Sequence, residues 1–247
     1  MRKILYIALC FTLISGCRKE QLDDCFSSTG DDITIERPVK PFNKINIGEK
    51  FKVTLIQDTI GEPRFQITAG KNVVEGIVAK VENGVLSVEN CNVCNFMRTY
   101  KREIKLKIFI RDLEELFVYG ATSVTNQDTL HFSTLHIDHS ALEDMSLTLD
   151  VSKELYIQSI NSGGLTLKGK CNIFKSSIEE ITDVDARDFV CEEVLMDTHT
   201  PLNCYVQARR LLFVKIYNKG NIFYVGEPSG LKEVNVQKGE GRLLPLN

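Results

Sequence analysis

The sequence contains no tryptophan, no marked excess of either charge and no apolar run long enough to span a membrane as a helix. Its 247 residues include 30 basic and 33 acidic side chains, which give a formal net charge of -3. This near balance excludes the basic surface that nucleic-acid-binding proteins present. Since 43% of the residues are hydrophobic, a mainly disordered chain is excluded as well. The absence of tryptophan disfavours a cleft specialised for stacking sugars.

The beginning of the chain has the features of an export signal. A short basic start precedes an uninterrupted apolar run over residues 4–14, and Ser15, Gly16 and Cys17 follow. A run of this length is typical of a signal-peptide core. The segment resembles a bacterial lipobox, which implies cleavage after residues 1–16 and transfer of a diacylglycerol to the Cys17 thiol. We therefore predict a protein anchored by lipid to the outer membrane, at its periplasmic face or at the cell surface. An ordinary signal peptide that happens to contain a cysteine is the alternative.

Residues 17–40 are mostly polar, with paired acids at 23–24 and 31–32. Such a stretch predicts a flexible tether after the lipidated Cys17. The remaining residues, 41–247, are predicted to form a single head domain.

From residue 44 onward, apolar and polar residues alternate in short runs. Clear examples are residues 51–57, 65–68 and 85–88. A period of two predicts half-buried strands, and turn residues such as those at 83–84 separate them. Residues 72–81 are predicted as a short helix.

The second half of the chain repeats an apolar anchor at intervals of 18 to 22 residues. The anchors are Leu116, Leu135, Leu155, Ile173, Val194, Leu212 and Val234. A second apolar pulse follows most anchors, at Val124, Leu147, Leu165, Val184 and Ile222. Two short strands in each period of about 20 residues predict an all-β fold, a parallel β-solenoid whose rungs stack on one another. A β-sandwich is the alternative, although the steady spacing and the scarcity of two-residue hairpin turns favour the solenoid.

Solenoid ends expose sheet edges that invite aggregation, so caps are expected. We predict a β-rich N-terminal cap within residues 42–110 and a second cap within residues 227–247.

Several of these segments resemble one bacterial domain family. The resemblance lies in residues 42–47, 51–57, 81–88 and 94–101. The family is the putative auto-transporter adhesin head (GIN) domain. Membership implies a right-handed parallel β-helix in a secreted or lipid-anchored protein with an adhesive role. It supplies no functional residues to carry over.

The cysteines predict structural rather than catalytic chemistry. Cys91 and Cys94 form a single CxxC motif, without the second pair of a zinc ribbon or the helix start of a redox site. In an oxidising envelope a local disulfide is the simplest interpretation, and other pairings stay open. Cys171, Cys191 and Cys204 are predicted to be mostly buried and free. The first two lie one period apart and could sit on adjacent rungs.

Three histidines lie close together in the sequence, at His131, His136 and His139. A metal site would need all three to converge. On a strand, however, His136 and Asp138 share one face and His139 points away. We therefore predict no metal site and no cofactor.

The sequence contains no nucleophile elbow and no phosphate-binding glycine loop. Its carboxylates are scattered through predicted turns. We predict a non-enzymatic, lipid-anchored envelope protein whose head binds a surface glycan or protein. One alternative is a polysaccharide-acting enzyme, which needs acids from neighbouring rungs to converge in a groove. Another is a periplasmic structural or regulatory binding protein.

Overall fold

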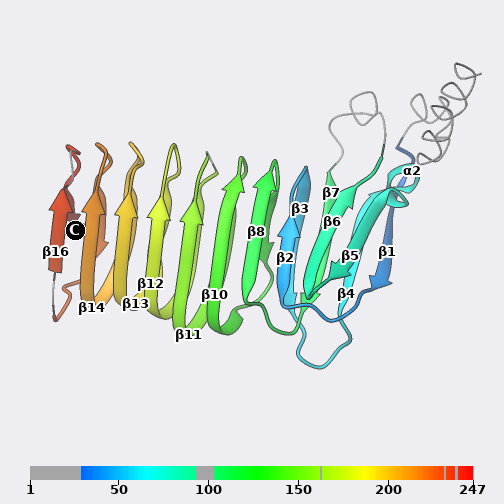
Figure 1. Cartoon of the computed structure of the whole chain (residues 1–247), viewed down its shortest axis with the longest axis horizontal. Helices are drawn as coiled ribbons and strands as arrows, with labels where there is room; N and C mark the ends of the chain where they lie inside the picture. The colour runs from blue at the N-terminus through cyan, green and yellow to red at the C-terminus, as the bar shows by residue number, and fades with distance from the viewer. Residues whose placement is uncertain (1–28, 93–102, 162, 231, 237–238, 247) are drawn as a thin grey trace, which may run out of the picture.

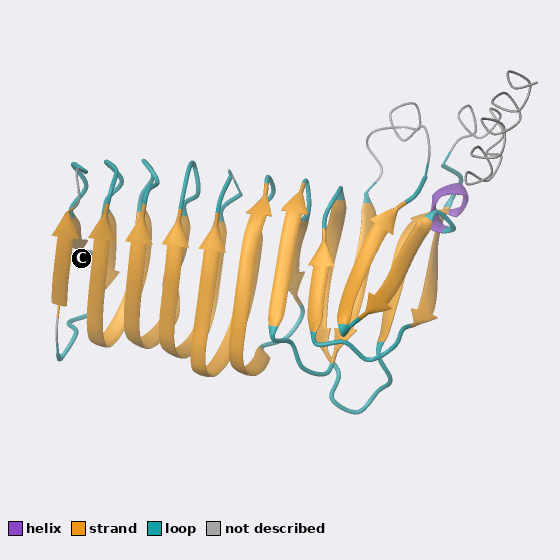
Figure 2. Ribbon diagram, viewed as in Figure 1, coloured by secondary structure: helices purple, strands orange, loops and turns teal. Residues whose placement is uncertain are grey.

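The computed structural model describes residues 29–92, 103–161, 163–230, 232–236 and 239–246. Apart from one short helix, every regular element within these residues is a strand, and the seventeen strands belong to one sheet. The sheet winds into a solenoid whose rungs are stacked along the long axis of the molecule (Figures 1 and 2).

The regular part of the solenoid is built from five long strands. They are β10 (Leu130–Ala141), β11 (Met145–Ser159), β12 (Leu165–Ile178), β13 (Val184–Thr198) and β14 (Cys204–Ile216). Each pairs in parallel with the next. The pairing confirms the predicted β-solenoid over a sandwich of antiparallel strands.

Each long strand bends midway, where its register shifts, for example between Val151 and Glu154. The part of the strand before the bend therefore belongs to one rung, and the part after the bend belongs to the next. We call the residues before each turn the first arm of a rung, such as 134–141, and those after it the second arm, such as 145–151. The first arms form the sheet nearest the viewer in Figure 1.

Three further rungs precede these, and their order in space differs from their order in sequence. They consist of β2 (Lys44–Ile47) with β3 (Phe51–Gln57), β6 (Val85–Asn90) with β7 (Ile104–Ile110), and β8 (Glu115–Gly120) with β9 (Ser123–Asn126). Strand β2 pairs with both β6 and β8, and β3 pairs with both β7 and β9. The earliest rung is therefore held between two later ones.

Antiparallel strands lie at this end of the molecule. They are β1 (Asp32–Pro38), β4 (Arg64–Gly70) and β5 (Ile77–Glu82). Strand β4 pairs with β7, β1 pairs with β4, and β5 pairs with β6. Their role as a cap stays a prediction. At the other end, β14 is followed by β15 (Ile222–Val225), β16 (Lys232–Val236) and β17 (Leu243–Pro245).

Two local expectations differ from the structure. Residues 32–38, placed in the tether, form β1, because Ile33 and Ile35 pack against the core between exposed polar neighbours. The predicted helix over 72–81 is limited to α2 (Lys71–Val74), and the rest forms β5. The β-branched residues there pair with β6, and that pairing overrides the local helical pattern.

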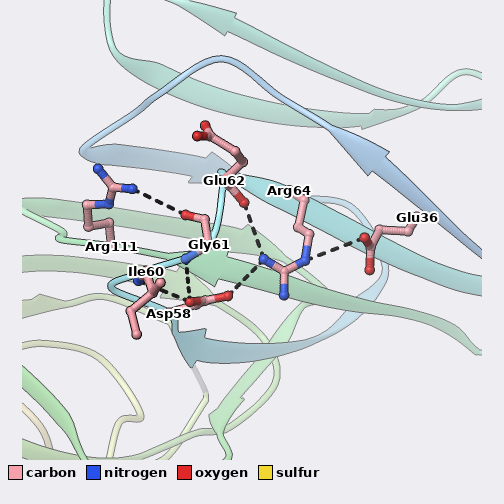
Figure 3. A network of polar contacts seen from close by, with 7 residues as sticks. All are labelled: Glu36, Asp58, Ile60, Gly61, Glu62, Arg64 and Arg111. Carbon is pink, nitrogen blue, oxygen red and sulfur yellow. Dashed lines mark hydrogen bonds and ion pairs between the residues drawn. The ribbon is translucent and has the colours of Figure 1, made fainter.

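A polar network closes the loop between β3 and β4 (Figure 3). Asp58 accepts hydrogen bonds from the backbone N–H groups of Ile60 and Gly61, at 3.2 and 2.8 Å. Its second oxygen pairs with Arg64 at 2.8 Å, and Arg64 also pairs with Glu36 on β1. The Gly61 hydrogen bond and the Arg64 guanidinium hold the pKa of Asp58 below its usual value. The network therefore ties the loop to β1.

The core consists of columns of apolar side chains in register on successive rungs. One column contains Leu135, Leu155, Phe174, Val194 and Leu212, each at most 1% exposed. Burying a side chain of this size contributes about 1.5–3 kcal/mol, so a rung is stable only when its neighbours cover it.

Three of the predicted anchors do not lie in this column. Leu116 is in register with Ile137, and Val234 with Val214. Ile173 is adjacent to Phe174, which occupies the column. The second pulse corresponds to another column, in which Met145 takes the place predicted for Leu147. That column contains Val124, Met145, Leu165, Val184, Cys204 and Ile222.

Candidate binding face

The outer surface of the first arms is the candidate site. Alternation points every second side chain outward, so outward residues of successive rungs form rows along the solenoid. One row contains Lys44, Glu115, His136, Tyr156, Lys175, Leu195, Phe213 and Glu233. The next contains Asn46, Phe117, Asp138, Gln158, Ser177, Asp197 and Lys215. We call these two rows the first-arm face.

Aromatic rings are a recurring feature of the first-arm face. The ring centroids of Phe117 and His136 are 6.3 Å apart, and those of His136 and Tyr156 are 4.9 Å apart in an edge-on arrangement. Tyr119, beside these rows, is 44% exposed and lies against Gly48. Tyr119 and Tyr156 are not in register with each other, because Tyr119 pairs with Ser140 and Tyr156 with His136. The face nevertheless offers several rings to a ligand.

Two shallow depressions interrupt the first-arm face. One, of about 450 Å³, is lined by Phe117, Tyr119 and Asp138 among others. The other, of about 220 Å³, lies between Tyr156 and Phe213. Both are open to solvent and combine rings with polar groups.

Ion pairs lie between Tyr156 and Phe213 on this face. Lys175 Nζ is 2.7 Å from a carboxylate oxygen of Glu154, and Lys215 Nζ is 3.2 Å from one of Asp197. Exposed pairs of this kind contribute at most about 1 kcal/mol to folding. Their effect on the face is to cancel its charges locally while leaving donors and acceptors available.

A larger groove of about 790 Å³ follows the bend on another side of the solenoid. Asp150 and Glu192 both line this groove. Their distance in the sequence did not indicate that they share one surface. Asp150 pairs with His131 at 3.4 Å and with Lys170 at 3.2 Å, and Glu192 pairs with Arg209 at 3.5 Å. Both acids are thus held in ion pairs with cations of the same groove.

The structure places the three histidines in different surroundings. His131 contacts Asp150, His136 lies between rings of the first-arm face, and His139 is buried. The prediction that His136 and Asp138 share a face while His139 points away is confirmed. In the part of the chain that the structure describes, no three potential metal ligands gather.

His139 is held by two polar contacts. Its Nδ1 is 3.1 Å from the Ser159 hydroxyl, and its Nε2 is 3.1 Å from the Glu143 carbonyl oxygen. Burial lowers the pKa of the His139 ring below its usual value. The His139 ring is therefore part of the packed core and is not available to a ligand.

The cysteines that the structure describes are either buried or exposed. Cys171, Cys191 and Cys204 are buried and free, as predicted, and Cys171 lies in register with Cys191 on the next rung. Cys91 is exposed. Its predicted partner Cys94 lies outside the described residues, as does Cys17, so the local disulfide and the lipid stay predictions.

The family described as "Putative auto-transporter adhesin, head GIN domain" matches residues 41–228. The chain belongs to this family. Membership indicates a cell-envelope protein with an adhesin-like role, and the family's description names no enzymatic activity. No curated protein matches the chain.

Several solved structures have a similar fold. A putative adhesin from Bacteroides fragilis is 21% identical, with a TM-score of 0.82 over 89% of this chain and 100% of that one. A putative adhesin from Parabacteroides distasonis is 16% identical, with a TM-score of 0.67 over 89% and 99%. A putative lipid binding protein from the same species is 16% identical, with a TM-score of 0.60 over 88% of this chain and 98% of that one. At these identities the likeness concerns the fold.

No helix among the residues that the structure describes is both long and apolar enough to cross a membrane.

Proposed function

We propose that this protein is a non-enzymatic, lipid-anchored adhesin-like head that binds a glycan or a protein on a surface through its first-arm face. The observation that carries the proposal is the recurrence of aromatic rings along that face, with ion pairs on the neighbouring rungs. Exposed rings tend to mark interaction sites, because water solvates them poorly. A solenoid repeats such groups along a rigid surface, which suits binding at several points.

The position of the predicted anchor is compatible with this function. Residue 29, where the described chain begins, precedes β1, and β1 lies at the opposite end of the molecule from β16 (Figure 1). A lipid on Cys17 would therefore hold the head by one end. The first-arm face, which runs along the side, would stay accessible.

Replacing Cys17 tests the anchor. We expect Cys17→Ala to move the protein from the membrane fraction to the soluble fraction and to abolish incorporation of labelled palmitate, because the thiol that accepts the lipid is lost. Cys91→Ala, which changes an exposed cysteine of the head, should leave both unchanged. Palmitate incorporation into Cys17→Ala would contradict the anchor.

The adhesive role is tested on intact cells. With a tag at the C-terminus, added protease should remove the head from cells if it is displayed outside. Protection would favour the periplasmic binding role instead. Cells that express the chain should then adhere to a glycan- or protein-coated surface more than cells that lack it.

A further inference from the structure

We infer that the depression between Tyr156 and Phe213 on the first-arm face binds a neutral, linear oligosaccharide. Such a site would deepen the proposed adhesin-like function, on which it rests, by giving that function a ligand class and a position.

The spacing of the two rings is set by the rungs. Tyr156 and Phe213 occupy the same outward row, with Lys175 and Leu195 between them on the intervening strands. Neighbouring strands are about 4.8 Å apart, so three steps place the rings roughly 14 Å apart. That distance suits a short chain of pyranose rings better than a single sugar.

Both rings are held in place before a ligand arrives. Tyr156 packs edge-on against His136, with ring centroids 4.9 Å apart. The Lys215 ammonium lies over the Phe213 ring, with its nitrogen 5.7 Å from the ring centroid. Because both side chains are half-buried and already ordered, stacking the apolar face of a sugar on them costs little conformational entropy.

The polar groups between the rings match the hydroxyls of a sugar. Lys175 is paired with Glu154 and Lys215 with Asp197, and Ser177 also lines the depression. Ammonium groups and the serine hydroxyl can donate to sugar oxygens, while the carboxylate accepts from sugar hydroxyls. Since each charge has a partner of opposite sign, the depression does not favour an acidic chain, and we assign it a neutral one.

The same ion pairs disfavour a protein as the ligand here. The buried centre of a protein interface is depleted in charged residues, because covering an ion pair removes its water. An oligosaccharide in a shallow depression of about 220 Å³ would leave these pairs partly hydrated and replace lost water with hydroxyls.

The experiment uses the full chain carrying Cys17→Ala, which is expected to be soluble. The probes are immobilised neutral oligosaccharides built from glucose, xylose, mannose or N-acetylglucosamine, with sulfated and uronic-acid chains as the acidic set. We expect binding to members of the neutral set. By titration calorimetry, Tyr156→Ala and Phe213→Ala should each weaken that binding about tenfold, whereas Tyr156→Phe should retain it.

Matched controls lie on the second-arm side. Tyr205 and Phe223 form a stacked pair there, with centroids 5.2 Å apart, and Tyr205→Ala and Phe223→Ala should leave the affinity unchanged. Ser177→Arg fills the depression without removing a packed side chain. It should abolish binding while keeping the melting temperature, so the site can be tested even if Tyr156→Ala unfolds the protein.

Two results would overturn the site. One is binding to acidic chains alone, and the other is neutral binding that Tyr156→Ala, Phe213→Ala and Ser177→Arg leave unchanged. If cells that express the chain still adhere after glycans are stripped from the target surface, a protein is the ligand: the oligosaccharide site is then wrong and the adhesin-like function stands. If they adhere to no surface, both fail.

Discussion

His139 is an ionisable ring inside the solenoid, and its surroundings favour the neutral form. The Asp138 and Asp144 carboxylates and the carbonyl oxygen of Glu143 raise its pKa, but burial outweighs them. A charged ring would lose most of its hydration without gaining a close, ion-paired carboxylate. The folded protein therefore favours the uncharged ring.

Acid should consequently destabilise the protein through His139. Above its unfolded pKa of about 6.5 the ring is neutral in both states. As the pH falls below that value, the unfolded chain takes up a proton that the folded chain resists, so the free energy of unfolding decreases until the folded pKa is reached. Each unit of pKa lowering corresponds to about 1.4 kcal/mol. Urea unfolding at pH 7.5, 6.5 and 5.5 measures the effect.

The histidine variants separate this effect from that of other groups. His139→Gln should flatten the pH dependence between 7.5 and 5.5, whatever it does to stability at pH 7.5. His131→Gln, which changes an exposed ring beside Asp150, serves as the comparison. An unchanged slope in His139→Gln would show that the buried ring does not cause it.

Single-residue environments were partly predictable. Alternation within one strand was enough to separate His139 from His136 and Asp138, because side chains of a strand point to opposite faces in turn. The groove that joins Asp150 and Glu192 was not predictable in this way. Those residues come together only through the register of neighbouring rungs and the bend, and neither leaves a local signal.

Among the elements, strand β12 depends on a close approach of two backbones. Gly169 has φ +105°, and a Cβ added there would collide with the Leu149 carbonyl oxygen on β11. Both the dihedral angle and the contact require glycine. An isolated glycine inside a strand pattern indicates such an approach in general terms, though not which backbone lies opposite.

We expect Gly169→Ala to destabilise the protein by roughly 3 kcal/mol or more, because backbone strain of about 1–3 kcal/mol adds to the clash. Gly226→Ala is the matched control. Gly226 has φ +80°, but nothing lies within 4 Å of an added Cβ, so the cost should be limited to strain of about 1–2 kcal/mol. Thermal and denaturant unfolding measure both. Equal losses in the two variants would contradict the role of the Leu149 contact.

The repeat predicted the solenoid but not its register. The anchors at residues 135, 155, 194 and 212 fall in one column, while those at 116, 173 and 234 do not. A shift of one or two residues keeps a period near 20, so spacing alone cannot assign a residue to its column. The first-arm face was missed for the same reason, since a row such as Tyr156, Lys175 and Leu195 exists only once the register is known.

At the scale of the whole molecule, we expect the C-terminal strands to protect the end of the solenoid from aggregation. Strand β16 covers the first arm of β14, and β17 covers β15. Without them, a parallel edge with unpaired backbone groups and the apolar side chains beneath it would be open to other molecules.

Deleting residues 231–247 should therefore cause aggregation, seen by light scattering and size exclusion. Deleting residues 18–28 is the control, because it removes none of the described strands and should leave the head monomeric. A soluble, monomeric product of the C-terminal deletion would show that these strands do not protect the end.

The insertion of β2 and β3 between two later rungs affects the order in which the chain can assemble. From β10 onward, each rung needs only the rung before it, so addition can follow synthesis step by step. The rung at residues 44–57 is different, because one of its neighbours ends at residue 110 and the other at residue 126. The rung at residues 44–57 can therefore be completed only once these distant partners are available, so we expect the first half of the head to form as one cooperative unit.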